Sequence, residues 1–277
     1  MALCIVLVLT TACSLQPAEG AKAPAPSQHT HAHECETSPA PEYLPTPEVA
    51  ELDKIYTLLA YSVVYKDWQR TGWQDPERAR GYNIGGILVD PARPTGEQLL
   101  CWARNSVITT RNGTQHGEVR LITNYLGNAK QHKLKGLKLY TTLEPCAMCS
   151  GMMTLQQLQT TIYGQTDPGF GKALERLSLD SSHSHGYCPY PRSVQSVRAS
   201  NRLTNEIDAT FARHGGNIVE WLASSEAEAL YRAANQQLKD FRVTFPGNAA
   251  ALENALEFLE KIPDSYTATP YTTACEG

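Results

Sequence analysis

The sequence predicts an α/β sandwich built around a mixed β-sheet. The chain has 277 residues, which is enough for one good-sized domain with an extension. Its apolar and charged fractions are ordinary for a soluble globular protein and exclude a chain that is disordered throughout. From residue 47 onward, segments with helical spacing of apolar residues alternate with short apolar runs bounded by turn residues. This alternation favours helices packed on a mixed sheet.

A local sequence pattern predicts each helix and strand of the main domain. The run PEVAELDKIYTLLAYSVVYKDW has near-helical apolar spacing, and NIGGILVD and EQLLCWARNSV are typical of strands separated by the turn-rich PARPTG. In TQHGEVRLITNYLG, Thr114 suits the N-cap of a helix and Gly127 suits its stop. The expected elements are a helix at 47–68, strands at 83–90 and 97–107, a helix at 114–127, a strand at 137–144, a helix at 146–159, a strand at 160–167 and a short helix at 170–180.

The regions that flank these elements have their own compositions. Residues 14–46 are rich in Pro, Ala, Ser and Thr, which is typical of a flexible linker. We expect a domain at 47–200 and a helical extension at 201–265, with a loop at 181–193 between them. The extension contains helical patterns at 202–214, 217–241 and 248–262, and the last of these has an apolar stripe that we expect to pack on the main domain. The stripe consists of Leu252, Ala255, Leu256, Leu259 and Ile262.

The first thirteen residues form a short apolar run that ends in Thr-Thr-Ala-Cys. The run has the length of a signal peptide and is too short to span a bilayer. Its end resembles a bacterial lipoprotein cleavage site, in which Cys13 is the lipidated residue and the possible lipid anchor. We therefore expect an exported protein, periplasmic or membrane-anchored, and the alternative is a cytoplasmic one with a frayed start.

The charge balance restricts the partners. A formal net charge of −4 gives no global attraction to nucleic acid or to an anionic membrane. Between Cys101 and Tyr190, however, nine Lys and Arg stand against five Asp and Glu, so the middle of the chain is mildly basic. This asymmetry permits a phosphate-bearing substrate without requiring one.

Two cysteines in the run LEPCAMCSGMM are spaced like metal ligands. Pro145 suits the first turn of a helix, and Cys146 and Cys149, at i and i+3, then project from one face of that turn. The positive end of the helix dipole favours thiolate over thiol. A structural zinc site would need two more ligands at similar spacing, whereas a catalytic site needs one and leaves the fourth position for water.

The upstream segment His116-Gly-Glu118 supplies the missing ligand at the start of the preceding helix. His116 completes a set of three, and Glu118 lies outside the set but near enough to carry protons. Zinc lowers the pKa of a bound water to about 7. A neighbouring carboxylate can then take a proton from that water and pass it to a ring nitrogen and to departing ammonia.

His-x-Glu together with Pro-Cys-x-x-Cys is the signature of zinc deaminases that act on nucleobases. The chain resembles the cytidine deaminase-like superfamily, and most closely the branch that contains tRNA adenosine deaminases and guanine deaminases. The resemblance covers about half of the chain, from roughly residue 55 to residue 180. It implies a three-layer α/β/α sandwich, zinc held by His116, Cys146 and Cys149, and proton transfer by Glu118. It also implies that Asn105 contacts the substrate and that the protein forms homo-oligomers.

Two departures from the branch bear on the substrate. Gly117 stands where the branch usually has Ala, which predicts a looser helix start because Gly costs about 0.5–1 kcal/mol in a helix relative to Ala. Gln165 and Thr166 replace the Ala-Arg that is common in tRNA-acting members. We therefore expect hydrolytic deamination of a free nucleobase or nucleoside. The alternative substrates are tRNA adenosine and single-stranded DNA or RNA cytidine.

Other interpretations of the cysteines remain open. Cys146 and Cys149 could form a redox pair, or the zinc could stabilise a non-catalytic binding module, but neither interpretation needs Glu118. In an oxidising compartment Cys35, Cys188 and Cys275 could form disulfides, with a Cys35–Cys275 bond joining the two ends. Cys101 is expected to be a buried strand residue.

Overall fold

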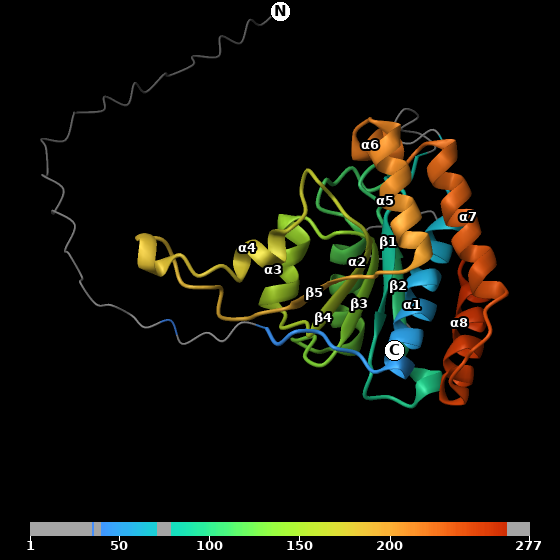
Figure 1. Cartoon of the computed structure of the whole chain (residues 1–277), viewed down its shortest axis with the longest axis horizontal. Coiled ribbons are helices and arrows are strands. Elements are labelled where there is room, and N and C mark those ends of the chain that lie inside the picture. The colour runs from blue at the N-terminus through green and yellow to red at the C-terminus, as the bar shows by residue number, and fades with distance from the viewer. Residues whose placement is uncertain (1–34, 36–39, 71–78, 265–277) are drawn as a thin grey trace, which may run out of the picture. The chain divides into compact units, whose positions relative to one another are not determined.

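The computed structural model describes residues 35, 40–70 and 79–264. At its centre lies a mixed sheet with the strand order β2-β1-β3-β4-β5 (Figure 1). β1 pairs antiparallel with both β2 and β3, whereas β3, β4 and β5 run parallel. The strands are β1 (Gly85–Val89), β2 (Leu99–Arg104), β3 (Lys138–Leu143), β4 (Thr160–Gln165) and β5 (Gln195–Arg198).

Helices cover both faces of this sheet, which confirms the predicted α/β/α sandwich (Figure 1). The helix α1 packs on one face, against β1, β2, β3 and β4, and α2 and α3 lie on the other face. α7 and α8 then pack on the outer side of α1 and add a further layer. The helices are α1 (Pro47–Tyr65), α2 (Gly117–Ala129), α3 (Ala147–Leu155), α4 (Ala173–Leu177), α5 (Arg202–His214), α6 (Ile218–Trp221), α7 (Ser225–Lys239) and α8 (Ala249–Lys261).

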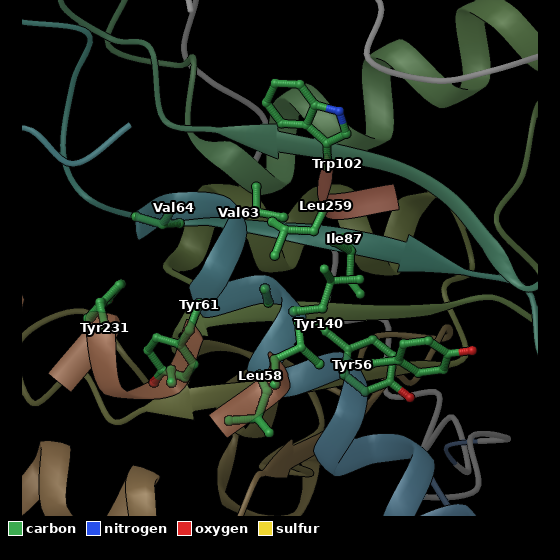
Figure 2. Packing of buried hydrophobic residues seen from close by; sticks show 14 of the residues in the cluster. Tyr56, Leu58, Tyr61, Val63, Val64, Ile87, Trp102, Tyr140, Tyr231 and Leu259 are labelled. Atoms are coloured by element: carbon green, nitrogen blue, oxygen red, sulfur yellow. The ribbon is translucent and has the colours of Figure 1, made fainter. Parts of the chain in front are cut away.

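The second half of α1 is buried on all sides because it lies between the sheet and the C-terminal helices. Every residue from Ile55 to Val64 is buried, as expected for a helix that is covered all round. Figure 2 shows Tyr61 of α1 beside Tyr231 of α7, and their rings meet edge to face with centroids 4.7 Å apart. The extension thus shares one hydrophobic cluster with the sheet, and the stripe on α8 lies in or against that cluster.

Three local expectations need correction. The strand β5 was not expected, because three of its four residues are polar, and none of the four is fully buried. The pattern at 217–241 divides into α6 and α7, since Ser224 caps a new helix by accepting a hydrogen bond from the N–H of Ala227. Gly127 does not stop α2, which continues to Ala129.

The segment before α1 contacts the sheet at two points. The carbonyl of Pro41 accepts a hydrogen bond from Gln195 at 2.8 Å. The Tyr43 hydroxyl lies 2.6 Å from both a carboxylate oxygen of Asp53 and the amine of Lys138. Residues 1–13, including Cys13, and most of the expected linker lie outside the described residues. Among the described residues, no helix is both long and apolar enough to cross a membrane.

Cys35 is disulfide-bonded to Cys188, which lies in the loop between α4 and β5. This pairing replaces the suggested Cys35–Cys275 bond, and Cys275 lies outside the described residues. The loop at 181–193 reaches away from the sheet (Figure 1), and Cys188 within it is exposed. Cys101 is buried in β2, as expected.

Removal of the disulfide is expected to lower the thermal stability of oxidised protein. The bond joins residues separated by 153 positions, so it constrains the unfolded chain, and such bonds contribute about 2–4 kcal/mol. Cys188→Ser should therefore lower the melting temperature by several degrees in calorimetry without reductant. Reductant should lower the wild-type value similarly and leave the variant unchanged. Equal melting temperatures for the oxidised proteins would show that the bond does not form.

Candidate metal centre

The ends of two helices bring the predicted metal ligands together. His116 is the N-cap of α2 and Cys146 is the N-cap of α3, both with extended backbone, and Cys149 lies in the first turn of α3. The expected boundaries therefore shift, since Pro145 precedes the cap and Thr114 does not cap α2. Thr114 instead donates its N–H and its hydroxyl to Asn112 in a turn before the helix.

The three ligand atoms form a triangle whose size fits a zinc ion. His116 Nδ1 lies 3.7 Å from each sulfur atom, and the two sulfur atoms lie 3.7 Å apart. A tetrahedral zinc with Zn–S bonds of about 2.3 Å separates its sulfur ligands by roughly 3.8 Å. Among the described residues, this is the cluster of metal-ligating side chains that could hold an ion. Donor types and spacing both fit zinc with one coordination position left open.

A hydrogen-bond contact joins the sulfur atoms of Cys146 and Cys149. This contact, with a further one from His116, lowers the pKa of Cys146 to about 3. The same contact and burial raise the pKa of Cys149 well above its usual value. The hydrogen bond to Cys146 raises the pKa of His116. Metal binding would release any proton held by these thiols, because thiolates are the ligands.

Glu118 lies beside this triangle but outside it. Its Oε2 is 3.6 Å from the sulfur of Cys149, and its Oε1 accepts a hydrogen bond from the hydroxyl of Thr141 at 3.2 Å. The side chain is only 3% exposed, and this burial raises its pKa above the ordinary value. A carboxyl group with a raised pKa next to a metal cluster suits a group that both accepts and donates protons.

Asn105 lies at the end of β2 and is completely buried. Its Oδ1 accepts hydrogen bonds from the backbone N–H groups of Tyr82 and Val107, at 3.2 and 3.3 Å. These two bonds fix the amide, and Nδ2 has no hydrogen-bond partner among the described residues. The next residue, Ser106, donates its N–H to the carbonyl of Gln115, which joins this segment to the residue before His116. The structure therefore places Asn105 at the same edge of the sheet as the metal cluster.

Glu144 is a site residue to which sequence reasoning gave no role. It is buried directly before Pro145, and its two carboxylate oxygens accept the backbone N–H groups of Asp167 and Lys172, at 3.0 and 2.8 Å. The carboxylate thereby fixes the connection between β4 and α4 beside the start of α3. The sequence did offer a signal, because Glu144 lies between an apolar strand and Pro145-Cys146. A charged residue buried at such a position needs hydrogen-bond partners.

Gly117 permits a close approach between α2 and β1. A Cβ atom at this position would lie 2.9 Å from the Cα of Gly85, which is a backbone atom that cannot rotate away. The first turn of α2 therefore rests directly on β1, between His116 and Glu118.

Gly117→Ala is expected to destabilise the protein and to disturb the site. Overpacking of this kind costs about 1–3 kcal/mol, and the shift it forces moves the residues on both sides. Urea unfolding should show this loss of free energy. Gly127→Ala is the matched control, because a Cβ at that exposed position of α2 meets nothing within 4 Å and should stabilise the helix by about 0.5–1 kcal/mol. Equal effects of both changes would contradict the close-approach explanation.

Comparisons with known proteins identify the region that contains these residues. A family model described as "Cytidine and deoxycytidylate deaminase zinc-binding region" matches residues 74–165. The tRNA-specific adenosine deaminase of Aquifex aeolicus is 30% identical over 103 residues, which are 37% of this chain and 68% of that protein. tRNA-specific adenosine deaminase 2 of Xenopus laevis is 30% identical over 112 residues, which are 38% of this chain and 63% of that protein.

The solved structures that align with this chain are less similar to it in sequence. A tRNA:A34 deaminase structure aligns with a TM-score of 0.38 and 20% identity, over 52% of this chain and 95% of that one. A guanine deaminase from Nitrosomonas europaea aligns with a TM-score of 0.36 and 15% identity, over 71% of this chain and 88% of that one. The chain spans less than two thirds of the length of several curated relatives, and the family match ends at residue 165, before the extension.

Proposed function

Because this chain belongs to the cytidine deaminase-like superfamily, we propose that it is a zinc-dependent hydrolytic deaminase that releases ammonia from an amino-substituted nucleobase or nucleoside. The observation that carries the proposal is the triangle of His116, Cys146 and Cys149 with the buried carboxyl group of Glu118 beside it. A zinc-stabilised binding module would not need that carboxyl group, whose burial is costly.

Each group at the site has a defined task. His116 would bind zinc through Nδ1, and the two thiolates would complete the protein ligands. Zinc held there supplies Lewis-acid activation of a water molecule at neutral pH. Glu118 takes a proton from the attacking water and delivers it to a ring nitrogen of the base. The oxygen of the water bonds to the carbon that carries the amino group. Glu118 then takes the second proton from that oxygen and gives it to the amino group, so the C–N bond breaks, ammonia leaves and a carbonyl group remains on the base.

The residues that depart from the tRNA-acting pattern favour a small substrate. Gln165 and Thr166 bind the extension: Gln165 accepts a hydrogen bond from the indole N–H of Trp221 at 3.1 Å, and Thr166 donates its N–H and hydroxyl to Asp208. Residues 201–264 contain ten Asp and Glu against six Lys and Arg. An acidic element fixed to the end of β4 disfavours a polyanion there.

The second candidate is a nucleic-acid deaminase that acts on tRNA adenosine or single-stranded cytidine. The observation that favours it is the similarity to curated relatives that are tRNA-specific adenosine deaminases. Salt separates the two candidates, because binding to a polynucleotide weakens steeply as salt rises whereas nucleoside binding responds little.

The experiment that tests the proposal is ammonia release by the purified, zinc-loaded full chain. The substrates would be guanine, adenosine, cytidine, deoxycytidine and their monophosphates, followed by single-stranded oligonucleotides and tRNA. Release from one of the small substrates supports the first candidate. Release from polynucleotides alone, with a steep salt dependence, supports the second. Silence on all substrates with one zinc bound per chain contradicts deaminase function.

Export and assembly belong to the same proposal. The Cys35–Cys188 disulfide supports an exported protein, because disulfides persist in oxidising compartments, and Cys13 would be its lipid anchor. We propose a deaminase domain at 47–200 and an extension at 201–265.

The outer face of α3 supports homo-oligomers, because it carries apolar surface that is only partly covered. This surface is formed by Met148, Gly151, Met152 and Leu155. Sedimentation of Met152→Glu against the wild type would test this interface.

A further inference from the structure

Gln165 is the last residue of β4. The neighbouring strand, β3, leads into the metal cluster. Gln165 pairs in register with Leu143, and its carbonyl accepts the N–H of Glu144 at 2.8 Å. Two residues after Glu144 comes Cys146, the N-cap of α3. Gln165 therefore occupies the carboxyl edge of the parallel strands, where ligands bind in open α/β sheets.

Strand alternation places this side chain on the face of the sheet that carries the metal cluster. Thr141 of β3 donates to Glu118 of α2, so its side chain points to that face. Thr141 is in parallel register with Tyr163, and Gln165 follows two residues later on the same strand. Because side chains alternate along a strand, Gln165 leaves the backbone on the same side as Thr141 and Tyr163.

The amide group of Gln165 is held in one orientation. Its Oε1 accepts the hydrogen bond from Trp221 Nε1, and both residues are completely buried. The indole N–H only donates, so the oxygen must face Trp221 and the NH₂ group must face away. Nε2 has no hydrogen-bond partner among the residues that the structure describes. A buried donor without a partner is destabilising and calls for an explanation such as a ligand.

We propose that Gln165 is a specificity-determining residue, whose Nε2 donates a hydrogen bond to an acceptor on the substrate base. The acceptor is a carbonyl oxygen or an unprotonated ring nitrogen. Trp221, from the extension, is the positioning residue that directs this donor. Asn105 Nδ2 is a second buried donor without a described partner at the same edge, so the base offers acceptors on two sides. The inference rests on the proposed function and deepens it.

The test measures binding separately from catalysis. Glu118→Gln, which blocks proton transfer, serves as the background in the zinc-loaded full chain, and equilibrium dialysis gives its Kd for guanine, adenosine, cytidine and deoxycytidine. Gln165→Met is added because it fills a similar volume and has no donor. Trp221→Phe is added because it keeps most of the ring and removes only the N–H that orients Gln165. Ammonia release by the wild type runs in parallel.

Gln165→Met is expected to raise the Kd of the bound base about 5- to 100-fold, since the acceptor of the base then stays buried without a partner. Trp221→Phe should raise it less, because the freed amide can still rotate into place. Tyr56→Phe is the matched control: it removes a buried hydrogen bond to Gln98, on the α1 side of the sheet, and should lower stability without changing the Kd.

A base analogue without one acceptor identifies the hydrogen bond itself. Purine analogues that carry carbon in place of a single ring nitrogen should bind more weakly to the background protein. The analogue that lacks the partner of Gln165 should show no further increase in Kd when Gln165→Met is added. If the Kd of every analogue rises by the same factor in the background protein and in the Gln165→Met variant, Gln165 does not contact the base.

The outcomes separate this inference from the proposed function. Ammonia release with an unchanged Kd in Gln165→Met overturns the inference and leaves the deaminase standing. A raised Kd without ammonia release from any substrate supports the binding role and overturns the catalytic proposal. No measurable binding of any base, together with silence in the ammonia assay, overturns both.

Discussion

Replacement of Glu118 by glutamine is expected to reduce the rate of deamination by about 10²–10⁴-fold. The amide has the same shape and can still accept the hydrogen bond from Thr141, but it cannot take a proton from water. Initial rates of ammonia release, measured on the substrate that the wild type prefers, give the ratio of kcat values. Zinc content and melting temperature should stay close to those of the wild type, because Glu118 lies outside the ligand triangle.

Thr141→Val is the control that separates proton transfer from the positioning of Glu118. It removes the hydroxyl that donates to Oε1 at 3.2 Å and leaves the carboxyl group in place. We expect a smaller loss than in Glu118→Gln, because the base is present but less well oriented. Glu118→Gln with more than a tenth of the wild-type rate would contradict the role of Glu118 as proton carrier.

The metal cluster was predictable from the sequence because its signals are local. His116 and Glu118 are two positions apart at one helix start, and Cys146 and Cys149 are three apart at another. Chemistry limits which residues can serve at such spacings, so short motifs carry most of the information. The sheet edge that joins them followed from the alternation of strands and helices.

The surroundings of the site were not predictable, because they depend on contacts between distant parts of the chain. Gln165 and Trp221 are separated by 56 positions, and Cys35 and Cys188 by 153. No local pattern marks either pair, since each residue alone suits many environments. The sequence showed only that Gln165 differs from the residue common in tRNA-acting members. The structure shows that this residue accepts a hydrogen bond from Trp221 of the extension.

The extension binds side chains at the sheet edge that carries the metal cluster. Arg198 at the end of β5 pairs with Asp208 of α5 at 2.8 Å, and Asp208 in turn accepts the N–H and hydroxyl of Thr166. Asn83, before β1, donates to the carbonyl of Leu222. Residues at the ends of three strands thus bind the extension directly. Its removal would free side chains beside the metal cluster as well as uncover α1.

Cys149→Ser is expected to abolish both zinc binding and deamination. The sulfur of Cys149 is completely buried at 3.7 Å from the other two ligand atoms, and a serine hydroxyl replaces a soft thiolate with a poor ligand. Metal analysis should fall from one zinc per chain to nearly none, with ammonia release at background. Metal removal from the wild type by a chelator should have the same effect and be reversed by zinc.

Thermal unfolding distinguishes loss of the metal from loss of packing. A ligand that binds only the folded state stabilises it by about 4 kcal/mol at a thousandfold excess over its Kd. The melting temperature of the wild type should therefore rise when zinc is added to metal-free protein, whereas that of Cys149→Ser should not. Cys101→Ala is the control, because Cys101 is equally buried but lies in β2, outside the ligand triangle. That variant should lose some stability through its smaller side chain and keep its full response to zinc. Retention of one zinc per chain by Cys149→Ser would exclude Cys149 as a ligand.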